Sequence, residues 1–270
     1  MPPRIYSMST KARKNSNLDP QALVQEAERL LAFKRICVIV PAFNEEQNIR
    51  RTVEEIIGSS LPLTVVVIND GSTDKTFEEA LQTKARVISL PFNLGIGGAV
   101  QTGFRYAYEN GFDFAVQVDA DGQHDVSFLK VLLEPVLTGR LDMTIGSRFI
   151  PPYTGFKSSF VRRIGIQFFA RLISFLTQYK VTDPTSGFRA FNRKLIEVFA
   201  RYYPADFPEP EAIVVAGRYG ARLEEVPVVM RKRQAGLSSI RYLKTLYYMI
   251  KVTVAVLLDK LKTRPKNIHD

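Results

Sequence analysis

The chain has 270 residues, with 37 lysines and arginines against 27 aspartates and glutamates, so its formal net charge is +10. A hydrophobic content of 46% excludes wholesale disorder and indicates a globular fold with a sizeable core. One cysteine, Cys37, excludes a disulfide framework, and two histidines argue against a multi-histidine metal site. No apolar run reaches the ~20 residues of a membrane-spanning helix. Because the N-terminus lacks an apolar signal core, we expect a cytoplasmic protein.

The positive charge lies at the two ends of the chain. Residues 1–35 carry seven basic and three acidic side chains, residues 231–270 carry ten and two, and the stretch between them carries 20 and 22. Basic ends beside a slightly acidic body can bind nucleic acid or an anionic membrane surface, or they can simply be solvated. The sequence contains no known nucleic-acid-binding module, so we expect no nucleic-acid partner.

The hydrophobic pattern predicts alternating helices and strands over the first half of the chain. Asp19-Pro20 is typical of a helix start, and the short apolar runs rich in β-branched residues are typical of buried strands. The expected elements are helix 19–32, strand 36–40, helix 46–57, strand 63–68, a helix from Ser72 or Thr73 to Leu81, strand 86–90, helix 95–110 and strand 112–118. This alternation predicts an α/β, Rossmann-like fold, a mostly parallel sheet with helices on both faces.

Beyond Asp121 the alternation is looser, but helices and strands are still expected. They are helix 126–137, strand 142–147, helix 158–180, a loop at 183–187, helix 193–202, strand 222–230 and helix 240–262. We therefore expect a basic N-terminal extension and helix (residues 1–34), one globular domain (35–238) and a basic amphipathic C-terminal helix and tail (239–270).

The last predicted helix has one apolar face, on which aliphatic and aromatic residues recur at intervals of three and four. Lysines flank this face, and Lys251 divides the apolar stretch. The pattern suits a helix that lies on an anionic membrane or docks against a small integral membrane partner. An ordinary core helix packed on the sheet remains the alternative.

Unusual polar residues follow the predicted strands. Asp119, Asp121 and Gln123 come directly after the strand that ends at Val118. Ligands bind at the carboxyl ends of strands in open parallel sheets. Two carboxylates and an amide oxygen in such a loop suit a hard divalent cation, Mg²⁺ or Mn²⁺. The sequence therefore predicts a metal site here.

Other residues of the sequence could bind phosphate groups held by that cation. No phosphate-binding loop of the nucleotide-triphosphatase type occurs, and the glycine-rich helix start at Gly95 could either face phosphates or serve as a tight packing turn. Arg148 and Arg231 or Arg233 could pair with a diphosphate, because a guanidinium donates two hydrogen bonds at once. His124 is expected to position its loop.

Five motifs in order now carry a resemblance to a known family. They are Val40-Pro-Ala-Phe-Asn-Glu45, Ile68-Asn-Asp-Gly-Ser-Thr-Asp74, Asp119-Ala-Asp-Gly-Gln123, Gly146-Ser-Arg148 and Asp183-Pro-Thr-Ser-Gly-Phe-Arg189. The set resembles family 2 glycosyltransferases with the GT-A fold, over about residues 35–240. Within that family it is most similar to the polyprenyl-phosphate sugar synthases, the group that includes dolichyl-phosphate mannose synthase.

The resemblance implies roles for individual residues. The metal on the donor diphosphate would be held by Asp121 with Gln123 and Asp119. The acceptor phosphate would meet Arg148 and Arg162 or Arg163, and Arg231 would neutralise donor phosphate. The nucleotide sugar would contact Pro41, Phe43, Glu45, Asp70, Asp119, Ala120, Asp121 and Gln123. The family often has Ser-Lys where this chain has Ser238-Ser239. Arg231 or Arg233 would then supply the positive charge that the lysine side chain supplies in the family.

The resemblance implies a metal-dependent, inverting transfer of sugar from a nucleoside-diphosphate sugar to a polyprenyl (undecaprenyl or dolichyl) phosphate. Asp121, Arg148 and Arg231 would be the catalytic residues of an enzyme that is peripheral on the inner face of the membrane. A hydroxyl acceptor would instead need a carboxylate base, for which Asp206, Glu209 and Glu211 are candidates, although each is more often a surface or capping residue. A third hypothesis is a non-catalytic binding subunit, against which the presence of Asp121 and Arg148 argues.

Overall fold

The computed structural model describes residues 34–151 and 160–231, with Arg29 and residues 251, 253, 254, 257, 258 and 267–269. One seven-stranded sheet, in the order β3-β2-β1-β4-β6-β5-β7, runs through the described chain. Its strands are β1 (Ile36–Ala42), β2 (Leu63–Asn69), β3 (Arg86–Ser89), β4 (Phe114–Gln117), β5 (Met143–Ser147), β6 (Arg189–Asn192) and β7 (Leu223–Pro227). The helices are α2 (Ile49–Ile57), α3 (Thr76–Leu81), α4 (Gly95–Glu109), η1 (Val126–Phe128), α5 (Leu129–Leu137), α6 (Phe160–Thr177), α7 (Arg193–Arg201) and α8 (Pro208–Arg218).

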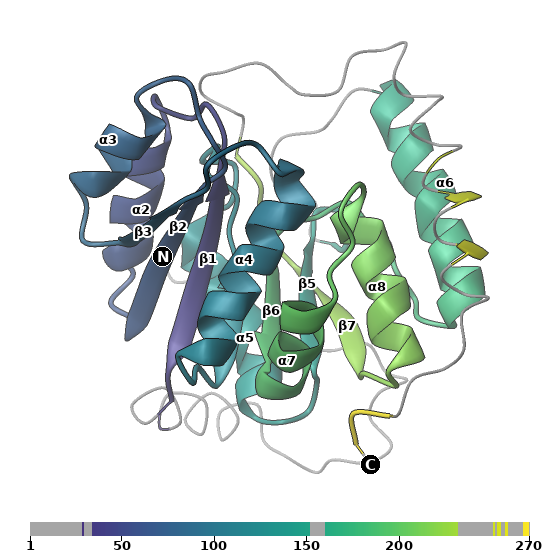
Figure 1. Cartoon of the computed structure of the whole chain (residues 1–270). Helices are drawn as coiled ribbons and strands as arrows, with labels where there is room; N and C mark the ends of the chain where they lie inside the picture. Colours follow the sequence, from purple (N-terminus) through teal and green to yellow (C-terminus); the bar gives the residue numbers. More distant parts are fainter. Residues whose placement is uncertain are drawn as a thin grey trace.

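The sheet is mostly parallel, as predicted. β1 pairs in parallel with β2 and β4, β2 with β3, and β5 with β7. Only β6 runs antiparallel among the described strands, and it pairs with β4 on one side and β5 on the other. Helices α2, α3 and α5 lie over one face of the sheet, and α4, α7 and α8 over the other, with α6 packed beside α8 (Figure 1).

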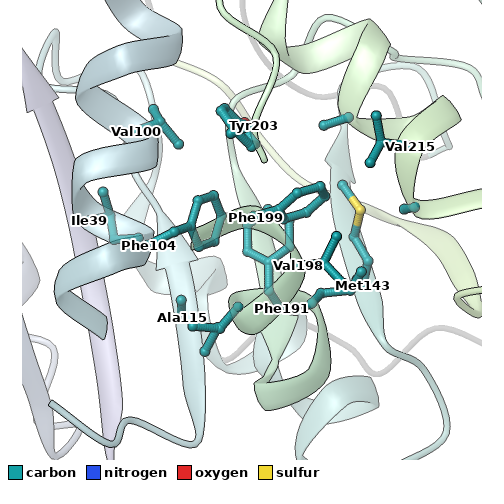
Figure 2. Packing of buried hydrophobic residues seen from close by; sticks show 14 of the residues in the cluster. Ile39, Val100, Phe104, Ala115, Met143, Phe191, Val198, Phe199, Tyr203 and Val215 are labelled. Carbon is teal, nitrogen blue, oxygen red and sulfur yellow. The ribbon is translucent and has the colours of Figure 1, made fainter. Parts of the chain in front are cut away.

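Apolar cores on both faces explain why the central strands read as continuous hydrophobic runs. Every residue of β1 is buried, and its single thiol, Cys37, has a pKa raised by burial to about 12. On one face, Phe104 of α4 packs edge-to-face on Phe191 of β6 with ring centroids 5.0 Å apart, and Phe199 of α7 completes the group (Figure 2). Apolar residues of α2 and α5 form the core on the other face.

The predicted start of α3, with Ser72 or Thr73 as its cap, was wrong. The helix begins at Thr76, and the Asp74 carboxylate, rather than Ser72 or Thr73, accepts the Thr76 N–H at 3.0 Å. Ser72 and Thr73 instead bind Asn44, whose backbone N–H donates to Ser72 Oγ and whose side-chain oxygen accepts the Thr73 N–H. The two polar residues therefore tie the loop after β1 to the loop after β2, a contact between segments far apart in sequence.

Two elements were not predicted. β6 has only four residues and begins with a charged one, Arg189, so its sequence carries no clear strand pattern. α8 begins at Pro208 and has Pro210 in its first turn, where proline is tolerated because that turn's N–H groups lack intrahelical partners.

The terminal predictions lie almost wholly outside the described residues. These are the helix at 19–32, the amphipathic helix at 240–262, and the boundaries at residues 34 and 238. Arg29 and residues 251, 253, 254, 257 and 258 are helical where they are described. Near the C-terminus the backbone N–H of Ile268 donates to Tyr219 O at 3.0 Å. None of the described helices is both long and apolar enough to cross a bilayer.

Candidate active site

The predicted motifs meet at one edge of the sheet. The carboxyl ends of the parallel strands β1, β2, β4, β5 and β7 share this edge, which places the loops at 41–45, 70–74, 119–124 and 146–148 together. Because β6 is antiparallel, its amino end lies at the same edge, with Arg189 opposite Gln117 and Ile145. The unpredicted strand therefore brings the fifth motif, at 183–189, to the other four.

The loop after β1 presents a mixed surface. Pro41 is buried near the end of β1, whereas Phe43, just after the strand, is 45% exposed. Glu45 donates its backbone N–H to Thr76 Oγ1 at 2.7 Å and accepts a hydrogen bond from Asn48 Nδ2. An exposed ring beside a fixed carboxylate is the kind of surface on which a nucleobase and ribose can bind.

Asp70 is buried and supports the start of α4. Its Oδ1 accepts the Leu94 N–H at 2.7 Å, and burial raises the pKa of the carboxyl while the hydrogen bonds from Leu94 and Gly95 oppose the shift. Further along α4, a Cβ added at Gly97 would collide with the backbone oxygen of Pro204. The glycine-rich helix start is thus a packing turn, and its first N–H groups bind Asp70.

The loop after β4 is held by His124, as predicted. The ring is buried and stacked on Phe188 with centroids 4.9 Å apart, and its Nδ1 accepts the Asp119 N–H at 3.1 Å. His124 Nε2 lies 3.5 Å from Asp119 Oδ2. The carbonyl of Ala120 accepts a hydrogen bond from Thr52 Oγ1, so the loop is fixed on both sides.

The donor set of this loop fits a divalent cation. Asp119 keeps a partly exposed carboxylate, and Asp121 Oδ1 accepts the backbone N–H of Gln123 at 3.0 Å. The Gln123 amide nitrogen donates to Arg231 O at 3.3 Å. Among the described residues no three histidine, cysteine or acidic side chains form a metal-binding cluster, so a cation held here would need further ligands such as phosphate oxygens.

Arg148 lies after β5 and is fixed by Asp183. Its Nε and Nη2 each donate to the Asp183 carboxylate at 2.6 Å, and Nη2 also donates to Thr185 Oγ1 at 2.9 Å. Burial alone lowers the pKa of Arg148, but the bonds and charge of Asp183 and the charge of nearby Asp119 more than offset it, so the pKa is raised. Within the described part of the chain Nη1 makes no hydrogen bond, which leaves one donor group for a ligand oxygen.

Asp183 is in turn positioned by Glu225 of β7. The Glu225 carboxylate accepts the backbone N–H groups of Thr182 and Asp183 at 2.7–2.9 Å and the Thr182 hydroxyl at 2.6 Å. Burial raises the pKa of Glu225, and these hydrogen bonds oppose the shift. Sequence reasoning missed the roles of Asp183, Thr185 and Glu225. Asp183 and Thr185 lie in a motif that the sequence showed, whereas nothing local distinguished Glu225.

The backbone of Arg231 contacts the loop after β4, whereas its side chain pairs elsewhere. Its N–H donates to Gln123 O at 2.8 Å, and the neighbouring Met230 forms a bridge with His124. Its guanidinium, however, pairs with Glu55 Oε2 at 2.6 Å and Asp125 Oδ1 at 3.1 Å. A donor phosphate would have to compete with these two carboxylates for the Arg231 side chain.

The three candidate bases have different surroundings. Asp206 is 63% exposed and pairs with Lys251 Nζ at 2.9 Å, and Glu211 is buried in α8. Burial raises the pKa of Glu209 to about 7, the charge of Arg189 opposes this, and the charge of Asp119 adds to it. The Glu209 carboxyl is thus electrostatically coupled to Asp119 in the loop after β4.

The expected acceptor-phosphate arginines of α6 are only partly described. Arg163 is exposed in the first turn of that helix, and the side chain of Arg162 lies outside the described residues. Arg233, the alternative to Arg231, also lies outside them. The structure thus places Asp119, Asp121, Gln123 and Arg148 at one edge of the sheet. Binding of the acceptor phosphate by the arginines of α6 stays a prediction.

The family model described as Glycosyl transferase family 2 matches residues 37–199. A UDP-N-acetylglucosamine–dolichyl-phosphate N-acetylglucosaminyltransferase of Methanococcus voltae is 30% identical over 217 residues, which cover 73% of this chain and 86% of that protein. A polyprenol monophosphomannose synthase of Mycolicibacterium smegmatis is 30% identical over 220 residues, with 77% and 81% covered.

Solved structures share the fold. Glucosyl-3-phosphoglycerate synthase from Mycobacterium tuberculosis, crystallised with Mn²⁺, UDP and glucosyl-3-phosphoglycerate, superposes with a TM-score of 0.67 and 21% identity. The match covers 91% of this chain and 86% of that one. This likeness confirms the predicted GT-A type of α/β fold.

Proposed function

Because the chain belongs to glycosyl transferase family 2, we propose that it transfers a sugar from a nucleoside-diphosphate sugar to a polyprenyl phosphate. The proposal is supported by relatives at about 30% identity that are named for transfer to dolichyl or polyprenol phosphate. The observation that carries it is the Arg148 guanidinium, which is oriented by Asp183, lies near Asp119 and keeps one donor group for an anionic acceptor.

The loops after β1, β2 and β4 would bind the donor. Phe43 and Glu45 offer a surface for the base and ribose, while Asp70 shapes the pocket by fixing the start of α4. The carboxylates of Asp119 and Asp121, with Gln123, would hold Mg²⁺ or Mn²⁺ against the diphosphate. Such a cation, when bound, supplies Lewis-acid stabilisation of the leaving nucleoside diphosphate. Structural neighbours crystallised with Mn²⁺ and UDP support this part of the proposal.

The acceptor phosphate would approach from the Arg148 side. Arg148 Nη1 would donate to an acceptor oxygen, which would attack the anomeric carbon with inversion as the bond to the diphosphate oxygen breaks. A phosphate oxygen is already anionic near pH 7, so no strong general base is required. The Arg148 charge also reduces the repulsion between the anionic acceptor and the anionic donor.

One observation favours a second acceptor class. Glu209 has a pKa raised by burial to about 7 and lies near Asp119, which are properties of a general base that acts at neutral pH. If the acceptor were a sugar hydroxyl, the Glu209 carboxylate would accept its proton during attack. The acceptor panel described next separates the two classes.

The testing experiment is a panel of donors and acceptors. Sugar nucleotides with UDP and GDP leaving groups are incubated with undecaprenyl phosphate, dolichyl phosphate or sugar-hydroxyl acceptors, with and without Mn²⁺ or Mg²⁺. We expect lipid-linked sugar and expect the Asp121→Ala variant to lose it by at least about a hundredfold. An unchanged melting temperature of the variant serves as the fold control. Near-normal transfer by Asp121→Ala would overturn the metal assignment, and product only on hydroxyl acceptors would favour Glu209 as base.

We also propose that the enzyme acts at an anionic membrane surface, on the cytoplasmic side, because its acceptor is a lipid and both chain ends are basic. A small integral membrane partner for the C-terminal segment belongs to the same proposal. Co-sedimentation of the full chain with anionic and neutral vesicles tests it, and equal recovery from both would contradict an electrostatic contact.

A further inference from the structure

A buried arginine lies at the amino end of β6, at the edge of the sheet where the predicted motifs meet. Arg189 is fully buried, and its guanidinium donates to the backbone oxygens of Ser186, Glu209 and Pro184 at 2.6, 2.7 and 2.9 Å. Burial lowers the pKa of Arg189, and the charges of surrounding groups oppose this effect. A charge in a protein interior is costly unless it is compensated, so this cation calls for a functional explanation.

Its three acceptors belong to two segments of the site. Pro184 and Ser186 lie in the loop whose Asp183 orients Arg148, and Glu209 lies in the first turn of α8. The guanidinium is planar and rigid, so three donors fix the separation of these segments better than a flexible amine could. Arg189 therefore joins the acceptor side of the site to α8.

The same loop lies directly on the predicted metal loop. A Cβ added at Gly187 would be 2.6 Å from Asp119 Oδ1 and 2.7 Å from Oδ2, which is closer than real Cβ contacts allow. The charges of Asp119 and Asp183 also act on Arg189. Loop 183–187 thus contacts Arg148 through Asp183 at one end and lies against the Asp119 carboxylate at Gly187.

We propose that Arg189 is a positioning residue that holds loop 183–187 against Asp119 and so sets the spacing between the acceptor-binding Arg148 and the donor-binding carboxylates. The inference rests on the proposed function, because that function assigns the acceptor to Arg148 and the donor to the carboxylates. It assigns no proton transfer or ligand contact to Arg189. Misplacement of a reacting group by about 1 Å can reduce turnover a hundredfold, so small movements of the loop would be measurable.

The chain offers a matched control four residues later. Arg193 also donates only to backbone oxygens in the described chain, those of Phe112 and Tyr108 at 3.0 Å and Ala107 at 3.4 Å. These groups lie at the C-terminal end of α4 and in the turn that follows it, away from the site edge. Arg193→Lys therefore removes the same kind of contact without moving the site.

The experiment compares Arg189→Lys and Arg193→Lys in the full chain. We expect both to lower the melting temperature, but only Arg189→Lys to lower kcat with polyprenyl phosphate, by about ten- to a hundredfold, with little change in the KM for the sugar nucleotide. Lysine keeps the charge, so a loss shows that geometry rather than charge matters. Equal kinetics for the two variants would overturn the proposal.

A second variant tests the same loop without removing a buried cation. Gly187→Ala places its Cβ against Asp119, and we expect the Kd for Mn²⁺ in the presence of UDP or GDP, measured by electron paramagnetic resonance, to rise about tenfold. Gly58→Ala, at the end of α2, is the control. Unchanged Mn²⁺ binding by Gly187→Ala would contradict contact between the loop and Asp119, even if Arg189→Lys fails to fold.

Failure of the proposed function is distinguishable from failure of this inference. If the wild-type protein transfers sugar only to hydroxyl acceptors, the named acceptor is wrong. Arg189→Lys should then still reduce that transfer, and Gly187→Ala should still weaken Mn²⁺ binding, because both effects depend on loop geometry alone.

Discussion

An arginine–aspartate pair lies at each end of strand β5. Arg148 directly follows β5 and donates from Nε and Nη2 to Asp183 at 2.6 Å. Asp142 directly precedes β5 and accepts hydrogen bonds from the same two nitrogens of Arg222 at 3.2 Å. Both aspartates are buried, but the Arg148 side chain is 15% exposed and that of Arg222 is 50% exposed. The two pairs have the same chemistry and different surroundings.

The two pairs differ in which side chain the protein surrounds more fully. Asp142 also accepts hydrogen bonds from Asn192 Nδ2, from the Arg222 N–H and from His269 Nε2, so its carboxylate is enclosed by the protein itself. At the other end the arginine is mostly buried, and in the described part of the chain its Nη1 makes no hydrogen bond. We infer that the pair at Asp142 serves stability and the pair at Arg148 serves binding.

The largest effect should come from replacing Arg148. Arg148→Lys keeps the charge and loses the two-pronged contact with Asp183, so we expect transfer to polyprenyl phosphate to fall about a hundredfold. Arg222→Lys makes the same chemical change at the other end and should leave turnover within twofold. Steady-state kinetics of the two purified variants measure the difference, and equal losses would show that the two ends do not differ in function.

Replacing Asp142 should affect stability and leave catalysis intact. Asp142→Asn weakens several hydrogen bonds to a buried group, and we expect the free energy of unfolding to fall by about 2 kcal/mol in urea titrations. Glu197→Gln, in an exposed pair with Arg201, should cost less than about 0.5 kcal/mol. A similar cost for the two variants would contradict the enclosed character of Asp142.

The pH dependence of the same variant gives a second measurement. Burial raises the pKa of Asp142, but the hydrogen bonds from Arg222 and His269 and the Arg222 charge more than offset it, so the pKa is lowered in the folded state. The stabilisation is therefore fully present above the unfolded pKa of about 3.9 and is lost as the pH falls through the lower folded value. Asp142→Asn should lose less stability than the wild type below about pH 4.

The smallest effect should come from His269. His269→Ala removes one hydrogen bond to Asp142 from a partly exposed ring, so we expect a loss of about 0.5–1 kcal/mol and unchanged turnover. Combining it with Asp142→Asn in a double-mutant cycle should give a smaller loss than the sum, because the variants share one contact. Strict additivity would show that the C-terminal turn contributes nothing to enclosing Asp142.

The positions of Asp119, Asp121 and Arg148 could be predicted because each follows a strand whose apolar run is plain in the sequence. Parallel strands place such residues together by a general rule. The direction of β6 could not be predicted in this way. Arg189 opens a four-residue strand, and its burial is compensated by oxygens of Pro184, Ser186 and Glu209, none of which a local pattern reveals.

Long-range contacts account for the other differences. The guanidinium of Arg231 pairs with Glu55, a residue 176 positions away. A donor phosphate would therefore have to compete with the Glu55 carboxylate for the predicted contact with Arg231. From the sequence, Glu209 was more often expected to be a surface or capping residue than a base. In the fold Pro208 and Pro210 lie in the first turn of α8, and burial, with a smaller contribution from the charge of Asp119, raises the pKa of Glu209.

The buried thiol in the central strand has a practical consequence. Cys37 is the chain's one cysteine, it is fully buried, and its pKa is raised to about 12. Since the thiolate is the reactive form, thiol reagents near neutral pH should modify it only when the sheet opens. A cysteine introduced at Phe175, which is 82% exposed on α6, could therefore carry a single fluorophore, and the native thiol would separately report the rate of global unfolding.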